Sequence, residues 1–368
     1  MNLSFSKLFF VLAFVFGLFA VMVIARSVLI PLSMALLVSF ILFPVVQKLE
    51  AWGVNRLLAA FLSLLMLFLI LGGSLTLISS QIMNFSDQIA GFTEKIMDIL
   101  SEVIVYINGN ISFIEDLNRE DLIEEGKSWL QSSSGTLLQS TFSTTTTLFT
   151  GIFTTIIFTF LILIYRDGLT KAFVSFGEEE NQDRIFRMLQ KIQRVGKQYI
   201  SGMFILILIL GFANSIGLLL IGIDNPFLFG FLAALLSIVP FVGTTIGAVI
   251  PVLYAFMSSD SLWVPVAVVI WFWAIQVIES NFLNPKIVGS SLNVNALVAI
   301  MSLLVGAAVW GVAGMILFLP FASILKVICE EFEQLKPIAM LISNDISGDE
   351  KKEEKASKWM EKVKGWFK

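Results

Sequence analysis

Histidine is absent from the 368 residues of this chain, and cysteine occurs once, as Cys329. A chain without histidine has no His-ligated metal site, no histidine triad and no histidine proton relay. A single cysteine excludes an intramolecular disulfide and any cysteine-based metal cluster. Proton or ion chemistry in this chain must therefore use carboxylates, amides, hydroxyls or backbone carbonyls.

Charge is also scarce, since charged residues make up 14% of the chain and hydrophobic residues 57%, against about 25% charged in soluble domains. Whole stretches carry no Asp, Glu, Lys or Arg at all, and most match the roughly 20 apolar residues that cross a bilayer. The sequence predicts an all-α, multi-pass membrane protein with the lipid bilayer as its surroundings. Seven of the charge-free stretches lie between Lys7 and Arg26, Arg26 and Lys48, Arg56 and Asp87, Lys197 and Asp224, Asp224 and Asp260, Asp260 and Glu279, and Lys286 and Lys326.

Two of the apolar blocks are too long for one plain span. The first, 226–257, is interrupted by Pro240-Phe241-Val242-Gly243, and the second, 296–326, is loosened by Gly306, Gly311 and Gly314. We expect each block to be a broken or re-entrant hairpin of two short helices, with the three glycines as hinges. The other predicted helices lie at 8–25, 28–47, 57–79, 147–165, 201–222 and 262–280, which gives about eight hydrophobic elements.

The loops predict an orientation, because basic residues favour the cytoplasmic side. Residues 87–127 hold ten acidic and three basic residues, whereas 166–197 holds seven basic ones. We therefore expect 87–127 outside and 166–197 inside, with both termini cytoplasmic. The predicted organisation is three first helices in 1–79, an extracytoplasmic helical segment in 80–146, a transport core in 147–326 with a cytoplasmic helical loop at 166–200, and a charged amphipathic tail in 327–368.

Irregular backbone at membrane depth survives only where protein, water or a ligand satisfies its polar groups. The first candidate for a substrate or ion path is therefore the interruption that contains Pro240, Phe241, Gly243 and Thr244. The alternative is a turn that only folds the chain back.

A second candidate lies at the end of the predicted helix 262–280, where carboxylate, amide and ammonium groups gather. Ionisable residues at this depth are costly and point to function. The alternative is that Glu279 and Lys286 mark the membrane interface, and Asn214 in the fifth span similarly fits either a polar solute or small-residue packing. The group consists of Gln276, Glu279, Asn281, Asn284, Pro285 and Lys286.

Signatures of enzymes and of nucleotide hydrolysis are missing. Gly126-Lys127-Ser128 imitates the end of a phosphate-binding loop, but Asp121 stands where its first glycine belongs. No nucleophile elbow of the form G-x-S-x-G occurs either. We expect no enzymatic activity, no cofactor and no nucleic-acid partner.

Several short motifs follow one another at a specific spacing along nearly the whole chain. They are Ile30-Pro31, Phe43-Pro44-Val45-Val46, Gly53 and Arg56, Tyr165-Arg166-Asp167-Gly168, Ile238 to Gly243, Glu279 to Gly289, and Gly311 and Gly314 before Pro320. This arrangement resembles the autoinducer-2 exporter family of bacterial membrane proteins. The resemblance implies a secondary transporter of about eight membrane helices that assembles as a homo-oligomer, with autoinducer-2 export in some members and sodium or lithium for proton exchange in others.

Three functions remain open from the residues alone. An uncharged furanone rich in hydroxyls suits amide and hydroxyl partners such as Asn214, Thr244 and Asn281, whereas an antiporter needs a titratable carboxylate, for which Glu279 is the candidate. The large acidic segment 80–146 keeps open a third function, that of a channel or a membrane scaffold whose outer segment binds a partner.

Overall fold

The computed structural model describes residues 5–70, 72–73, 150–239, 242–259, 261–289 and 292–344. In these ranges the chain is helical and carries no strand, and its one β-type pairing is an isolated bridge between Val294 and Ser343. The predicted all-α class is therefore confirmed. The predicted outer segment 80–146 and the predicted tail beyond residue 344 lie outside the described residues.

Five helices of the described chain are long and apolar enough to cross a membrane: Arg26–Ala51 (α2), Thr150–Ser175, Glu179–Ile221, Trp263–Gly289 and Ala296–Glu331 (α10). Shorter helices accompany them, namely α1 (Phe5–Ile24), Arg56–Ile70, α6 (Pro226–Leu236), α7 (Val242–Ser258) and α11 (Lys336–Ile342). The third span consists of the short η1 (Glu179–Asn181) and the 40-residue α5 (Gln182–Ile221), and the fourth begins with α8 (Trp263–Ile278). Large apolar side chains such as Phe16, Leu220 and Trp273 are exposed on these helices, as expected for lipid-facing surfaces.

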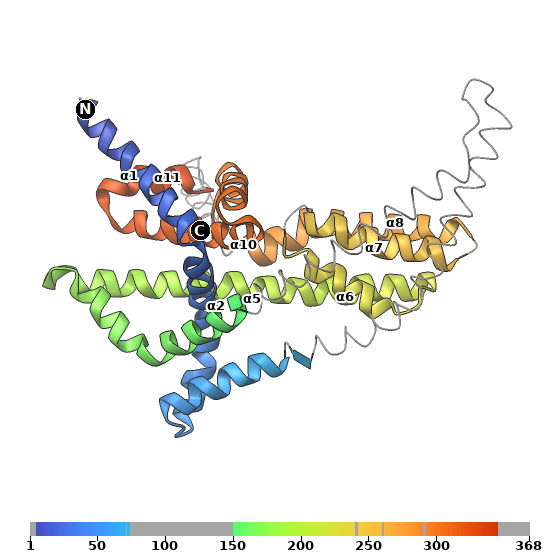
Figure 1. Cartoon of the computed structure of the whole chain (residues 1–368), viewed down its shortest axis with the longest axis horizontal. Helices are drawn as coiled ribbons and strands as arrows, with labels where there is room; N and C mark the ends of the chain where they lie inside the picture. The colour runs from blue at the N-terminus through green and yellow to red at the C-terminus, as the bar shows by residue number, and fades with distance from the viewer. Residues whose placement is uncertain are drawn as a thin grey trace, which may run out of the picture. The chain divides into compact units, whose positions relative to one another are not determined.

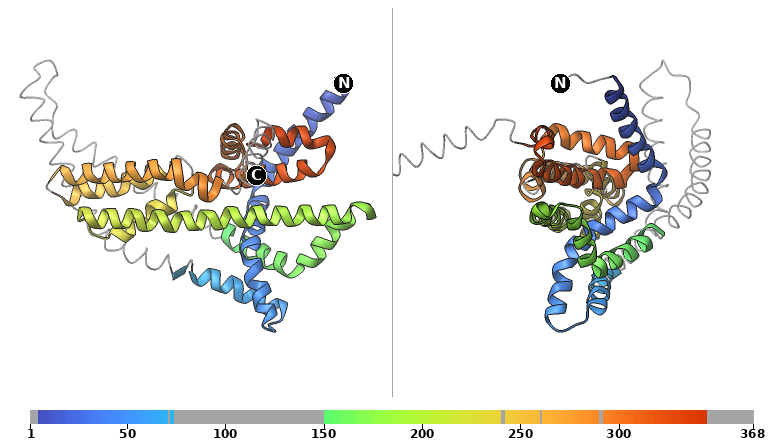
Figure 2. Two further views of the ribbon diagram at one scale, coloured as in Figure 1. Left: turned by 180° about the vertical axis from the view of Figure 1, so that it is seen from behind. Right: turned by 90° about the vertical axis from the view of Figure 1, so that its left-hand side faces the viewer.

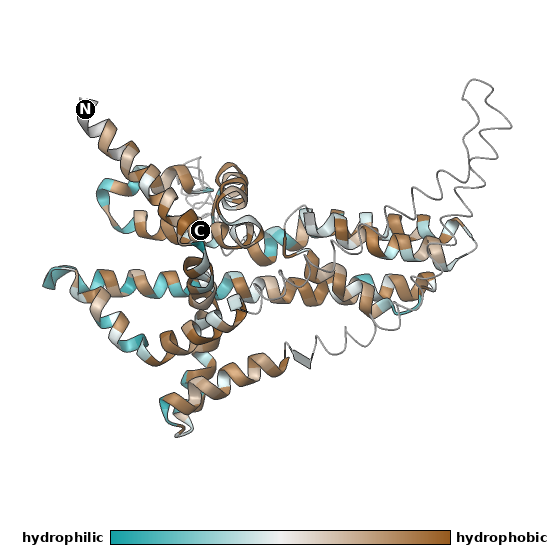
Figure 3. Cartoon of the chain, in the orientation of Figure 1, coloured by the Kyte–Doolittle hydropathy of each residue, from teal (hydrophilic) through white to brown (hydrophobic). Residues whose placement is uncertain are grey.

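Helix α5 joins two segments that the sequence predicts separately, the end of the helical loop at 166–200 and a span at 201–222. The glycines between them do not break the helix, because they let neighbours pack closely. The place of a side chain on Gly196 is taken by Phe40, and a Cβ on Gly202 would lie 2.8 Å from the carbonyl oxygen of Ile287. Figure 3 shows the two characters of the helix, with hydrophilic residues gathered in its first half and apolar ones in its second.

The described chain forms two compact units. Unit 1 comprises 1–60, 158–206 and 280–368, and unit 2 comprises 61–157 and 207–279. The division passes through α5, which contributes to both units, and between Glu279 and Ser280, just beyond the end of α8, which lies wholly in unit 2.

In unit 1, α10 reverses direction within its own length. Gly311 has φ 60° and ψ −136°, a conformation outside the helical region that glycine adopts without steric cost. Gly306 and Gly314, on either side of the reversal, meet so closely that a side chain on either would overlap with the backbone of the other. The predicted hairpin in 296–326 is therefore present, with Gly311 at its turn (Figure 1).

Polar contacts anchor the two arms of α10 in unit 1. The Trp310 indole donates to the Met22 carbonyl at 2.9 Å, and the Tyr199 hydroxyl donates to the Ile316 carbonyl at 3.0 Å. At the start of the helix, the Asn295 side chain accepts from the Val298 amide at 2.9 Å. These bonds satisfy polar atoms inside an apolar unit, as burial requires.

A cluster of four charged side chains ties distant parts of unit 1 together. Glu50 contacts Arg166 and Arg56, and Asp167 contacts the same two guanidiniums. The Arg166 guanidinium also lies 5.3 Å from the centre of the Phe43 ring. The two carboxylates balance the two cations, so the cluster is neutral as a whole and joins the end of α2 to the helix 150–175.

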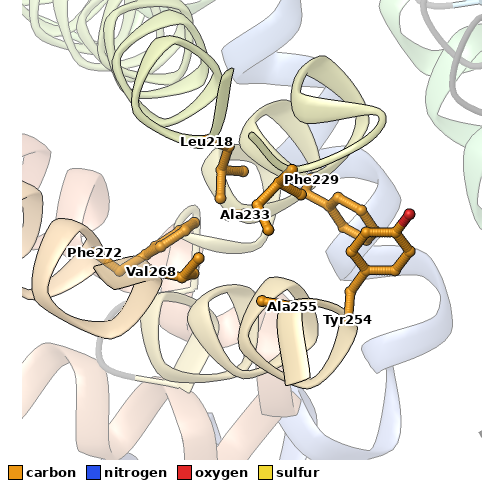
Figure 4. Packing of buried hydrophobic residues seen from close by; sticks show 8 residues of the cluster. Leu218, Phe229, Ala233, Tyr254, Ala255, Val268 and Phe272 are labelled. Atoms are coloured by element: carbon orange, nitrogen blue, oxygen red, sulfur yellow. The ribbon is translucent and has the colours of Figure 1, made fainter. Parts of the chain in front are cut away.

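Unit 2 is built on the other predicted hairpin, in the block 226–257. Helices α6 and α7 pack against each other, and α7 packs on α8 (Figures 1 and 2). Their shared core centres on Phe229, Ala233, Tyr254, Val268 and Phe272 (Figure 4). The rings of Phe229 and Tyr254 are 4.7 Å apart. The predicted break of the block 226–257 into two short helices is confirmed.

The glycine contact in α10 predicts a large effect of a single methyl group. Gly314→Ala places a Cβ against the Gly306 backbone, which cannot move aside as a flexible side chain would. We expect a loss of about 1–3 kcal/mol, measured as a lower Tm of the detergent-solubilised protein. Gly17→Ala is the matched control, since nothing lies within 4 Å of its added methyl, and equal Tm values for the two variants would contradict the close contact.

Candidate functional site

A small polar cavity lies inside unit 2, where the second half of α5 meets α6, α7 and the end of α8. Its volume is about 20 Å³, which is room for about one water molecule. Four of the residues predicted from the sequence line it, so the structure brings together groups from three separate stretches of the chain. The lining consists of Leu210, Asn214, Ala233, Ala234, Ser237, Thr244, Phe272, Ile275, Gln276 and Glu279.

Glycines at the α6/α7 contact place Thr244 and Ser237 at the cavity. The Cβ position of Gly243 is taken by the Leu236 carbonyl, and a Cβ on Gly247 would lie 2.9 Å from the Cα of Ala233. Because neither glycine carries a side chain, the two helices approach each other closely. The end of α6 and the first turn of α7 therefore form one wall of the cavity together. Gly243 is thus a residue that positions the wall and does not itself line the cavity.

Asn214 and Glu279 dominate the electrostatics of the cavity. Their exposed fractions are 5% and 6%, and the Asn214 Oδ1 atom is buried without a hydrogen-bond partner. Among the described residues, no Lys or Arg forms an ion pair with Glu279. A buried acceptor and a buried carboxyl group without counter-ion are both costly in apolar surroundings, so the site is suited to a hydrogen-bond donor or a cation.

The helix changes its geometry where Glu279 stands. Regular α8 ends at Ile278, and π-helical segments follow as η2 (Glu279–Leu283) and η3 (Pro285–Gly289). Such wide turns are rare and occur often at functional sites. Glu279 is buried at this change, whereas the next three residues are exposed.

Four of the predicted residues beyond Glu279 do not line the cavity. Asn281, Asn284, Pro285 and Lys286 are exposed and lie in η2, in η3 and at the residue between them, within unit 1. The Asn281 side chain donates to the Ser280 hydroxyl at 3.3 Å. Of the predicted group, only its first two residues, Gln276 and Glu279, line the cavity.

The remaining predicted residues either lie outside the described ranges or belong to unit 1. Pro240 and Phe241 lie outside the described residues. Gly306, Gly311 and Gly314 form the turn and the contact of the α10 hairpin in unit 1 and do not line this cavity.

Sequence reasoning missed the apolar and hydroxyl walls of the cavity. Phe272 and Ile275 precede Glu279 by seven and four residues, the spacing of one helical face, so helical periodicity read back from Glu279 points to both. Ser237, whose hydroxyl donates to the Ala234 carbonyl at 2.7 Å, closes α6 just before the predicted interruption. No group of three or more metal-ligating side chains gathers among the residues described.

Comparison with known proteins agrees with this architecture. Residues 8–334 match the AI-2E family transporter profile. The chain is 34% identical to YrrI and 32% identical to YueF of Bacillus subtilis (strain 168), over 38% and 35% of this chain and 38% and 34% of theirs. The chain therefore spans little more than a third of those two relatives in these matches.

A longer match connects the chain to a protein of Escherichia coli (strain K12). The AI-2 transport protein TqsA is 22% identical over 87% of this chain and 90% of its own length. Together with the family match over residues 8–334, these observations identify the chain as a multi-pass membrane protein that belongs to the AI-2E family of transporters.

Proposed function

We propose that this chain is a secondary transporter that exports a small, polar, uncharged solute such as AI-2, and that the unit 2 cavity is part of the path. The observation that carries the proposal is the pair of buried polar groups in that cavity, Asn214 and Glu279, with the half-buried Thr244 and Gln276 beside them. Buried polar groups cost stability unless they are partnered. A path for a polar solute gives the chain a reason to keep them.

The name of TqsA supports AI-2 as the first solute to test. A solute with several hydroxyls offers donors to Asn214 Oδ1 and to the Glu279 carboxyl group, and acceptors to amide N–H groups. Because the cavity holds about one water molecule, a larger solute enters only if the helices around it separate.

Exchange of a monovalent cation for protons is the second candidate. It is favoured by the size of the cavity and by the carboxyl group of Glu279, which has no paired cation among the described residues. Carboxylate and amide oxygens are suitable ligands for a hard cation. A proton or a small ion fits this volume as it stands, which a furanone does not.

The proposal includes a bacterial inner-membrane location with both termini cytoplasmic. It is supported by the seven basic residues of 166–197 and by the acidic excess of 87–127. We also propose assembly as a homo-oligomer, with 80–146 as an outer segment that serves assembly or partner binding. A scaffold function would follow if that segment bound a partner and no solute moved, and a channel function would follow if solute moved only down its gradient.

The carboxyl group of Glu279 decides between the two transport functions. Glu279→Gln keeps the shape but removes the titratable group, so we expect sodium-dependent proton flux in proteoliposomes to fall at least about tenfold if that flux exists. Glu180→Gln, at an exposed carboxylate of η1, is the control and should leave flux unchanged. Sodium-dependent proton flux that survives Glu279→Gln would remove Glu279 from the ion path, and unaltered vesicles without such flux would discard the cation function. AI-2 efflux is measured in the same vesicles.

Asn214 offers a test that separates stability from transport. Asn214→Leu removes a buried acceptor without a partner, so we expect an unchanged Tm or a gain of about 1 kcal/mol, together with a loss of AI-2 efflux. Ser215→Ala is the control, because that hydroxyl donates to the Gly211 carbonyl of its own helix at 2.6 Å. A lower Tm for Asn214→Leu would show that the amide supports the fold instead.

A further inference from the structure

Trp271 carries a second buried polar atom without a partner in unit 2. Its Nε1 is buried and forms no hydrogen bond within the described part of the chain. The edge of the indole that contains Nε1 occupies the space that a side chain on Gly217 would fill. The absence of a side chain at 217 thus allows the indole to lie directly against α5.

The indole lies along the same helix contact as the cavity. Gly217 is three residues beyond Asn214 on α5, about 4.5 Å further along the axis and on the same face. On α8, Trp271 precedes the cavity residue Ile275 by four residues, and Ile275 precedes Glu279 by four. One face of α8 and the turn that follows it therefore carries Trp271, Ile275 and Glu279 in chain order. The facing side of α5 carries Asn214 and Gly217.

The two atoms without partners have opposite hydrogen-bonding character. Asn214 Oδ1 only accepts, and Trp271 Nε1–H only donates. A buried tryptophan usually finds a partner for its N–H, and packing alone does not explain an indole here, since phenylalanine fills apolar space without leaving a donor unsatisfied. Hydroxyl groups and water molecules both donate and accept, so they can satisfy either kind of atom.

We propose that Asn214 and Trp271 form a hydroxyl-binding track that continues the cavity along the α5/α8 contact, with water in the resting state and a hydroxyl of the transported solute in its place during transport. This inference rests on the proposed function and narrows its solute. An N–H donor repels a bare cation and attracts an acceptor oxygen. The track therefore selects neutral solutes that carry hydroxyls, and Trp271 determines specificity through its N–H.

The first test is AI-2 efflux from proteoliposomes with Trp271→Phe, which keeps an aromatic ring and removes the N–H. Trp273→Phe is the matched control, because Trp273 is on the same helix and 68% exposed. We expect Trp271→Phe to raise the KM for AI-2 about tenfold with Tm unchanged, which corresponds to the loss of about one hydrogen bond. The control should match the unaltered protein, and equal KM values for all three proteins would overturn the role of the N–H.

The second test measures the track without transport. In detergent-solubilised, 15N-labelled protein, the Trp271 indole signal is identified by its loss in Trp271→Phe. We expect the Trp271 indole proton to exchange with D2O, and to exchange more slowly when AI-2 is added. The exchange rate of the Trp273 indole proton should not change when AI-2 is added. A proton that stays protected from D2O overturns the track.

The two arms distinguish water from solute. If the Trp271 proton exchanges at the same rate with and without AI-2, the track holds water alone, and the assignment of a solute hydroxyl to it is overturned. Unaltered vesicles that move no AI-2 would overturn the proposed function, and the exchange of the Trp271 proton with D2O would still decide whether a polar track exists.

Discussion

The structure depends on one constraint, that polar groups in apolar surroundings must find partners within the chain. Helices satisfy most backbone groups internally, so the chain is free to change direction only where something else supports the turn. In both hairpins that support is a close contact of small residues, Gly306 with Gly314 in unit 1 and Gly247 with Ala233 in unit 2. Side-chain hydroxyls follow the same rule, since Ser215 and Ser237 each donate to a carbonyl of their own helix.

The exceptions to this rule fall into two kinds. Glu50 and Arg166 each have one buried atom without a hydrogen bond, but both belong to a cluster in which opposite charges adjoin. Asn214 and Trp271 also have one such atom each, but both side chains are neutral and belong to no such cluster of charges. The first kind is compensated by Coulomb attraction, whereas the second kind is what the proposed track would satisfy.

The sequence predicted the architecture well because its signals are physical and strong. Long stretches without charge predicted the spans, and interrupted blocks predicted both hairpins, which the reversal at Gly311 and the α6/α7 contact confirm. The helix α5 was predicted in two parts, because the charge-free stretch that marks its span begins only after Lys197. The structure continues one helix through both parts, with Gly196 and Gly202 admitting Phe40 and the Ile287 backbone. Close packing between distant segments has no local signal.

The same limit applies to the candidate site. Glu279 and Asn214 were recognisable by themselves, as polar residues inside apolar runs. That Asn214, Thr244 and Glu279 surround one cavity depends on how three helices pack, which no spacing within one helix encodes. Trp271 was missed for a further reason, because a tryptophan in an apolar helix is ordinary, and only the missing partner of its N–H makes it notable.

The size of the cavity adds a final step. A volume of about 20 Å³ holds one water molecule or small ion, so passage of a larger solute requires the walls to part. The walls differ in how they resist this. Gly243 and Gly247 hold α6 against α7 through backbone contact, whereas α8 contributes the side chains of Phe272 and Ile275 to the lining. A side chain can change its rotamer without moving a helix axis, so the α8 wall can yield at a lower cost than the α6/α7 contact.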